Sequence, residues 1–244
     1  MTYCVALNLK EGLIFISDTR TNAGVDHISI FRKMHIFGKE NERFITLQTS
    51  GNLATSQAVL GHLRNEITLA KEPNIMTIPT LFEIAEHVGK TLKAVIQQVS
   101  SDPLDQGNYS SSILLGGQII TEKPKLYNIY PQGNFIQATT DTPFFQIGES
   151  KYGKPILDRA LNYHTPLDEA LRCSLISFDS TLRSNVSVGL PLDVVVYKSN
   201  SFKIPLGKRI YEHDPYFEII SQQWSDTLKK GLQALPTPTD DYWE

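Results

Sequence analysis

The second residue of the chain, Thr2, combines two groups that can carry out hydrolysis once it becomes the first residue. A small residue after an initiator methionine allows that methionine to be removed, so we expect the mature chain to begin with a free amino group on Thr2. The hydroxyl would then be a nucleophile, and the α-amine of the same residue would be its base. Many proteins have threonine at this position, so the interpretation depends on the residues that follow.

Two apolar runs follow Thr2, and a short turn that contains glycine joins them. The runs span residues 4–9 and 13–17, residues 10–12 form the turn, and the second run ends at Asp18. This pattern predicts a β-hairpin. In an antiparallel hairpin the start of one strand lies beside the end of the other. We therefore expect Thr2 and Asp18 to meet at one end of the hairpin.

The opening of the chain resembles the proteasome β-subunits. The matching features are the strand after Thr2, Ser-Asp-x-Arg-x-x-Ala-Gly at residues 17–24, Lys33 before a strand at 34–37, and a strand at 44–50 that runs into Gly51. The opening and the length are similar in particular to Anbu, a bacterial proteasome-type protease also described as an ancestral β-subunit. The match is specific over residues 2–60 and extends in outline to about residue 200.

The resemblance implies an N-terminal-nucleophile hydrolase with an α+β fold, a four-layer αββα sandwich. It implies a threonine-type peptidase, which hydrolyses amide bonds through an acyl ester on Thr2 and needs no cofactor or metal. The expected partners are a peptide or protein substrate and further copies of the chain in a ring or a helix. We expect one domain over residues 1–244, with a C-terminal extension from about residue 200 that the proteasome pattern does not explain.

The resemblance also assigns roles to residues around Thr2. Lys33 would lie beside the nucleophile, where its ammonium lowers the pKa of the hydroxyl and of the amine. Asp18 would hold Lys33 in a buried ion pair. Gly51 would offer its backbone N–H to the developing oxyanion, and it would open a helix. Arg20 is expected to support the site by pairing with an acid across its loop.

The sequence departs from the family where supporting hydroxyls and an acid are expected. Ser150, Ser184 and Ser187 fall near those positions, and we include Ser184 and Ser187 among the catalytic candidates. Ser184 stands where the family has an acid, while Asp179 comes several residues earlier. Each serine can equally be structural, and the departure leaves the Thr2 amine without an identified acid to support it.

Composition describes an ordinary globular protein. Its 244 residues are 41% hydrophobic and carry a formal net charge of −3, so no basic excess indicates nucleic acid. No apolar run is long enough for a transmembrane helix, and the start lacks the pattern of a signal peptide. Two cysteines predict no disulfide framework. We therefore expect a cytoplasmic protein without membrane partners, and the sequence does not show whether an unfoldase assists it.

The rest of the chain reads as alternating blocks of helices and strands, which favours a mixed sandwich over a parallel doubly wound sheet. Helices are expected over 52–71, 80–100, 151–163, 165–181 and 215–232, with Thr80 and Thr165 as N-caps. Strands are expected over 113–115, 119–120, 125–130, 134–138, 144–147, 186–189 and 192–197. The Pro-rich tail from Leu235 is either a frayed terminus or an arm that docks on a neighbouring subunit.

Two other functions fit the same residues. The chain could be a proteasome-like scaffold with little peptidase activity, which the loss of the acid at Ser184 favours. It could also be a hydrolase of the same class that acts on small amides.

The six histidines are scattered without the spacing of a metal site. Cys4 would be a nucleophile only after loss of the first three residues.

Overall fold

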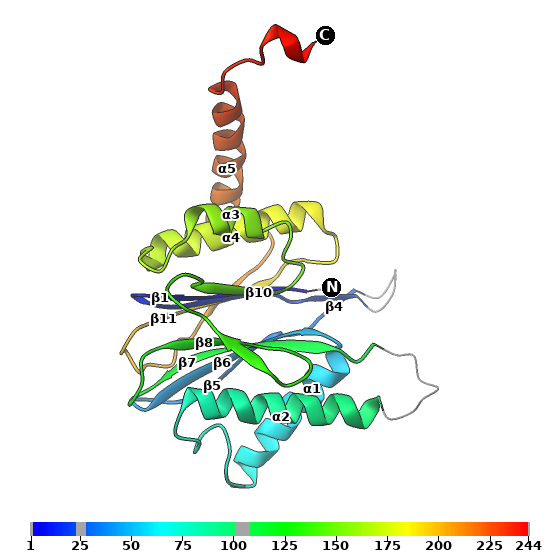
Figure 1. Cartoon of the computed structure of the whole chain (residues 1–244), viewed down its shortest axis with the longest axis vertical. Helices are drawn as coiled ribbons and strands as arrows, with labels where there is room; N and C mark the ends of the chain where they lie inside the picture. Colours follow the sequence, from blue (N-terminus) through cyan, green and yellow to red (C-terminus); the bar gives the residue numbers. More distant parts are fainter. Residues whose placement is uncertain (1, 23–27, 101–107, 244) are drawn as a thin grey trace.

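Two five-stranded antiparallel sheets form the centre of the computed structural model, which describes residues 2–22, 28–100 and 108–243. Met1, the Ala23 and Gly24 of the opening motif and most of the expected loop at 101–109 lie outside the described residues. The chain is an α+β sandwich of the expected kind, with one helical layer outside each sheet (Figure 1).

The first sheet has the strand order β10-β1-β2-β11-β12. Its strands, in chain order, are β1 (Tyr3–Leu9), β2 (Gly12–Asp18), β10 (Phe144–Gly148), β11 (Leu192–Lys198) and β12 (Lys208–Ile210). The expected hairpin is present, since β1 and β2 pair from Cys4 opposite Ser17 to Leu9 opposite Gly12. Its register brings the start of β1 to the end of β2, which is the end that carries Asp18.

The second sheet has the order β5-β6-β7-β8-β9. Its strands are β5 (Met34–Lys39), β6 (Arg43–Gly51), β7 (Ser111–Ile119), β8 (Lys125–Ile129) and β9 (Phe135–Gln137). A separate ribbon pairs β3 (Arg20–Asn22) with β4 (Ile28–Ile30). The sequence predicted a loop for β3 and missed both β4 and β12, each of which has only three residues.

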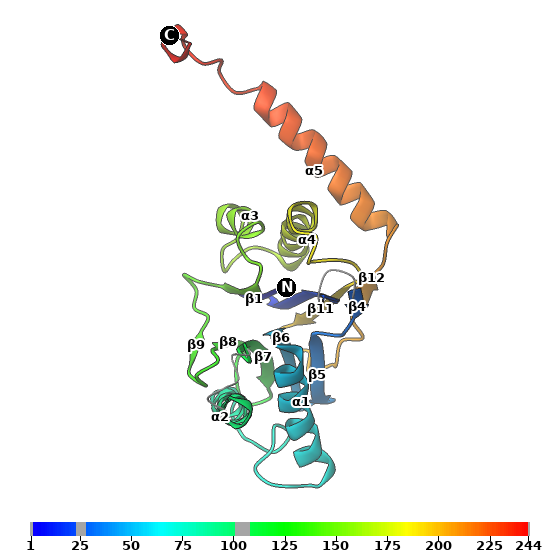
Figure 2. The same cartoon turned by 90° about the vertical axis from the view of Figure 1, so that its right-hand side faces the viewer.

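In the described part of the chain, four α-helices cover the two outer faces and a fifth projects from the body (Figure 2). The helices are α1 (Leu53–Thr68), α2 (Leu81–Val99), α3 (Lys154–Ala160), α4 (Leu167–Ser184) and α5 (Pro215–Gln233). Helices α1 and α2 pack on the second sheet, and α3 and α4 pack on the first (Figures 1 and 2). No helix in the described part of the chain has the length and apolar character needed to cross a bilayer.

Both faces of each sheet are buried, and this explains why the first strands alternate only loosely. Tyr3 and Val5 point to the core under α3 and α4, whereas Cys4 and Ala6 point to the core between the sheets. A strand buried on both sides needs apolar residues at successive positions. The apolar run therefore marks a strand at the centre of a layered protein.

One predicted break in a strand is wrong. Strands were expected at 113–115 and 119–120 with Gly116 and Gly117 between them, but β7 runs through both glycines. A Cβ at Gly117 would lie 2.1 Å from the carbonyl oxygen of Phe44 on β6. The glycine is needed for close approach of the two strands, which is a role that glycine in a strand often has.

Two helix starts were also read with partial success. Thr80 caps α2 as expected, because its hydroxyl accepts a hydrogen bond from the Glu83 N–H. Thr165 does not cap α4: its hydroxyl accepts from the Asn162 N–H instead, and Pro166 is the N-cap residue.

The expected strand at 186–189 is a turn, in which the Val188 N–H donates to the Asn185 carbonyl.

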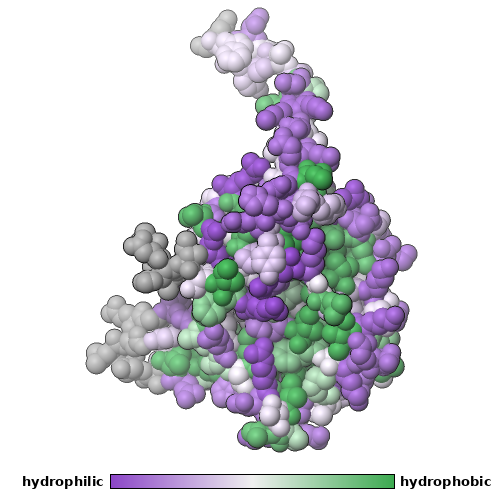
Figure 3. Space-filling view, turned by 180° about the vertical axis from the view of Figure 1, so that it is seen from behind, coloured by the Kyte–Doolittle hydropathy of each residue, from purple (hydrophilic) through white to green (hydrophobic). Residues whose placement is uncertain are grey.

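The expected helix near the C-terminus is present as α5, and it has few contacts with the body. Phe217 and Ile220 are its buried residues, while Leu228 and Leu232 further along are more than half exposed. In the view from behind, hydrophobic residues lie among hydrophilic ones along this projecting helix (Figure 3). The tail after it ends in a single short turn over Asp240–Tyr242.

Substitutions at two glycines distinguish the effect of close strand packing on stability from the effect of helix propensity. We expect Gly117→Ala to lower the free energy of unfolding by about 1–3 kcal/mol, because overpacking forces the strands apart. Gly61→Ala is the control: nothing lies within 4 Å of the Cβ it would add, and alanine in a helix is favoured by about 1 kcal/mol. Urea denaturation of both variants measures the difference, and equal effects would contradict the close-approach explanation.

Candidate active site

The peptide group between Thr2 and Tyr3 is held by two hydrogen bonds. The Tyr3 N–H donates to Asp18 Oδ1 at 3.0 Å, and the Thr2 carbonyl accepts from the Glu149 N–H at 2.7 Å. Thr2 is buried, with 8% of its surface exposed. The Thr2–Asp18 end of the hairpin therefore forms as the sequence predicted, and the start of the chain is fixed there.

The side chains of Asp18 and Lys33 form a buried ion pair. Lys33 Nζ lies 2.7 Å from Asp18 Oδ1, and neither residue has more than 4% of its surface exposed. The ammonium also donates to the Arg20 carbonyl at 2.6 Å. Burial raises the pKa of Asp18, and the Lys33 ammonium and the N–H groups of Tyr3 and Gly189 oppose this. The expected pairing of these two residues is thus present.

Thr2 and Lys33 line one pocket of about 540 Å³ at the strand ends of both sheets. Pockets of this size hold small ligands or a short stretch of peptide. The lining residues are Thr2, Thr21, Lys33, Thr49, Ser50, Gly51, Asn52, Leu53, Ser56, Gly148 and Glu149. Hydroxyl, ammonium, carboxylate and backbone groups therefore converge on one space beside the proposed nucleophile.

Gly51 lines this pocket, although its local structure differs from the expectation. It is the last residue of β6, and Asn52 is the residue that caps α1. Its φ is +103°, and a Cβ would lie 2.3 Å from the Ser110 carbonyl oxygen. Both observations require glycine at this position. Gly51 thus ends a strand directly before a helix, as the sequence motif predicted, although it does not itself begin that helix.

The serines named from the sequence do not line the pocket. Ser184 is exposed at the end of α4, and Ser187 is half-buried in the following turn. Ser150 lines a different pocket, beside α3. Asp179 is buried but pairs with Arg183 at 3.1 Å on its own helix. The structure places Thr2, Lys33 and Gly51 in one pocket and keeps these hydroxyls outside its lining.

A carboxylate that the sequence analysis missed does line the pocket. Glu149 follows β10, and 10% of its side chain is exposed. Its Oε2 accepts from Asn185 Nδ2 at 2.9 Å, and Asn185 is itself buried. Nothing in the local sequence marks Glu149, because only the pairing of β1 with β10 brings residues 2 and 149 together.

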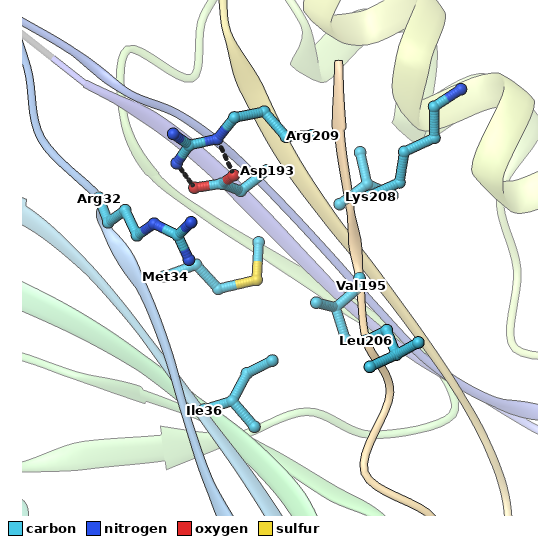
Figure 4. A pocket seen from close by; sticks show the side chains of 10 residues that line it. Arg32, Met34, Ile36, Asp193, Val195, Leu206, Lys208 and Arg209 are labelled. Carbon is cyan, nitrogen blue, oxygen red and sulfur yellow. Dashed lines mark hydrogen bonds and ion pairs between the residues drawn. The ribbon is translucent and has the colours of Figure 1, made fainter.

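Arg20 and Arg32 both lie outside the pocket lining. The Arg20 guanidinium donates to the Val186 carbonyl at 2.9 Å, and among the described residues no acid forms an ion pair with it. Arg32 lines a second pocket of about 270 Å³, which also contains the Arg209–Asp193 ion pair (Figure 4). Arg32 and Lys33, which precede β5, thus line different pockets.

Cys4 and His35, two further side chains with shifted pKa values, lie outside the lining of the Thr2 pocket. Burial raises the pKa of the Cys4 thiol, and the same residue is fully enclosed between the sheets. Burial lowers the pKa of His35 to about 4, and Arg64 beside it adds to the shift. Within the described ranges, no group of three or more histidine, cysteine, aspartate or glutamate side chains is arranged to hold a metal.

Comparison with models of known protein families identifies the family of the chain. The family model for proteasome subunits matches residues 2–196, which include every residue of the pocket and most of the two sheets. The chain belongs to the proteasome family. Curated protein sequences include no significant match. The matched range ends within β11, so α5 and the tail lie beyond the part that the family model describes.

Solved structures of Anbu proteins are similar over almost the whole chain. The Anbu complex of Pseudomonas aeruginosa, described as a helical assembly, is 51% identical with a TM-score of 0.95, covering 98% of this chain and 99% of that one. Anbu of Yersinia bercovieri is 50% identical with a TM-score of 0.92, covering 97% and 98%. A Gly-1 mutant from Hyphomicrobium sp. strain MC1 is 42% identical with a TM-score of 0.91, covering 98% and 100%. The chain therefore falls within the Anbu group of the proteasome family, and the likeness includes α5.

The buried ion pair gives a stability prediction. We expect Lys33→Ala to lower the free energy of unfolding by about 3–5 kcal/mol, because it leaves Asp18 buried without its counter-ion. The control is Lys39→Ala, since Lys39 is exposed and pairs with the partly exposed Glu42. Loss of such a surface pair costs less than about 1 kcal/mol. Denaturant titration compares the two variants, and similar losses would show that the Lys33 pair contributes no more than a surface pair.

Proposed function

We propose that this proteasome-family chain is a threonine-type peptidase, in which Thr2 becomes the first residue and hydrolyses amide bonds. The observation that carries the proposal is the pocket in which Thr2 lies beside Lys33, with Lys33 held by the buried carboxylate of Asp18. A buried, oriented ammonium next to a hydroxyl is an arrangement that activates nucleophiles. A surface lysine without these contacts would give no such argument.

The proposed reaction has two stages. The Thr2 hydroxyl attacks the substrate carbonyl while its own α-amine accepts the proton, directly or through a water. An α-amine titrates near pH 8 in model peptides, so it can serve as a base at neutral pH. The amine then returns the proton to the leaving nitrogen, and an acyl ester on Thr2 remains. Water hydrolyses this ester with the same amine as base.

Lys33 and Gly51 would stabilise the charge that develops in both stages. The Lys33 ammonium favours the ionised form of the neighbouring hydroxyl. The N–H of Gly51 would donate to the oxyanion of the tetrahedral intermediate, a contribution of about 3–4 kcal/mol in comparable sites. Asp18 would act through Lys33 by fixing the position of its ammonium. Ser184 and Ser187 stay untested as supporting residues, and their side chains lie outside the lining of the pocket.

Substitution of Thr2 tests the nucleophile. We expect Thr2→Ala to abolish peptide hydrolysis, a loss of several orders of magnitude, because the attacking oxygen is gone. Thr2→Ser keeps a hydroxyl and should retain measurable activity. Thr91→Ala on α2, where the hydroxyl bonds to the His87 carbonyl, is the control. The measurement is turnover of fluorogenic peptides, together with mass mapping of a threonine-directed electrophile.

The alternatives predict other results in the same experiment. Undiminished hydrolysis by Thr2→Ala would overturn the assignment of the nucleophile. A chain that keeps Met1, does not react with the electrophile and turns over no substrate would be a scaffold subunit. Turnover of small acylated amines but not of peptides would identify a small-amide hydrolase.

We further propose that the chain acts as a homo-oligomer and that α5 contributes to the contact between copies. The Pseudomonas aeruginosa relative forms a helical assembly, and α5 carries exposed apolar residues on a helix that projects from the body (Figure 2). Apolar side chains on a projecting helix are stabilised when a neighbouring subunit covers them. The same chemistry would let the Pro-rich tail dock as an arm.

Charge placed on α5 tests this contact. We expect Leu228→Asp combined with Leu232→Asp to shift the protein from assemblies toward smaller species, because the buried carboxylates would lose their hydration. Ile120→Asp replaces an equally exposed apolar residue in the body and is the control. Sedimentation velocity measures the distribution of sizes. Assemblies of unchanged size in the α5 variant would exclude this helix from the interface.

A further inference from the structure

Glu149 occupies a position in the pocket for which the proposed mechanism gives no role. Its backbone N–H donates to the carbonyl of Thr2 at 2.7 Å, so the two residues are adjacent in space. Gly148 makes this adjacency possible: its φ is +83°, and a Cβ there would lie 1.9 Å from the Thr2 carbonyl oxygen. The chain thus turns tightly against Thr2, and Glu149 is one of the residues that line the same pocket.

The orientation of this carboxylate is fixed by a buried amide. Asn185 Nδ2 donates to Glu149 Oε2 at 2.9 Å, and Asn185 Oδ1 accepts from the Ser187 N–H, also at 2.9 Å. The second bond determines which end of the amide faces Glu149. Because the amide is neutral, it orients the carboxylate without cancelling its charge. The segment at 184–187, where the sequence suggested supporting hydroxyls, thus contributes a backbone donor and an amide.

The other charges around Thr2 leave Glu149 largely uncompensated. Lys33 and Asp18 form a pair with each other at 2.7 Å. Lys151 lies 3.5 Å from Glu149 Oε1, but 68% of its side chain is exposed, so solvent screens it. Asp179 on α4 is paired with Arg183. A carboxylate that is almost buried therefore belongs to a residue lining the pocket in which the amine of Thr2 is proposed to act as a base.

We propose that Glu149, oriented by Asn185, is the positioning residue for the α-amine of Thr2 and supplies the carboxylate that is absent at Ser184. The inference rests on the proposed function, since it requires Thr2 to begin the chain. Lys33 alone would favour the neutral amine and weaken it as a base, whereas a neighbouring carboxylate favours the protonated form. Glu149 would thus keep the amine basic enough to accept the hydroxyl proton.

The test is the protonation of the Thr2 amine, which does not require turnover. Intact mass first establishes that the chain begins at Thr2. The amine is then labelled with limiting acetic anhydride across the neutral and alkaline range, and the N-terminal tryptic peptide is quantified by mass spectrometry. We expect the labelling midpoint in Glu149→Gln to fall by about one pH unit, which leaves roughly ten times more neutral amine at pH values below both midpoints.

Two further variants separate this role from a structural one. Asp179→Asn removes a buried carboxylate that does not line the pocket, and its midpoint should match that of the unmodified chain. Asn185→Ala keeps the Glu149 charge but removes the group that orients it, so we expect a smaller fall in the labelling midpoint. This variant tests the role of Glu149 even where Glu149→Gln does not fold. Where peptides are hydrolysed, the acidic limb of kcat/KM should shift with the labelling midpoint.

The contrary results are distinct. Unchanged midpoints in Glu149→Gln and Asn185→Ala with a free Thr2, or an equal shift in Asp179→Asn, would overturn the role of Glu149 and leave the proposed peptidase standing. A mature chain that still carries Met1 would remove the base and overturn the proposed function together with this inference.

Discussion

The ion pair between Asp18 and Lys33 is the interaction on which the arrangement of the site depends. It joins the end of β2 in one sheet to the residue before β5 in the other. The same carboxylate accepts the N–H groups of Tyr3 and Gly189, which belong to the start of β1 and to the turn after α4. One buried charge therefore sets the positions of four segments, and a buried charge tolerates little change in its partners.

The layered core explains why such a site can be rigid. Both sheets are covered on both faces, so the strands that end at the pocket cannot shift without opening a packed interface. The residues at the strand ends are therefore positioned by the fold as a whole. Groups held in this way need little reorganisation during a reaction, which is the main source of electrostatic stabilisation in enzyme sites.

Sequence reasoning succeeded where the information was local. The hairpin and the Thr80 cap lie within short stretches whose periodicity or motif is visible in the chain, and the Asp18–Lys33 pair was implied by the resemblance to the proteasome β-subunits. It failed where pairing between distant strands decided the outcome. Glu149 reaches Thr2 through the β1–β10 register, and Gly117 lies inside a strand because β6 passes close beside it. Neither contact produces a recognisable pattern in the sequence around Glu149 or Gly117.

The anchoring of Thr2 has a consequence for the energetics of any reaction there. Residues near a chain end are normally among the most mobile parts of a protein. Here the peptide group between Thr2 and Tyr3 is bonded to Asp18 and Glu149, so the conformational entropy of this part of the backbone is already lost when the protein folds. A molecule that enters the pocket would meet the hydroxyl of a residue whose backbone is already immobilised. This is the entropic advantage that intramolecular reactions have over encounters in solution.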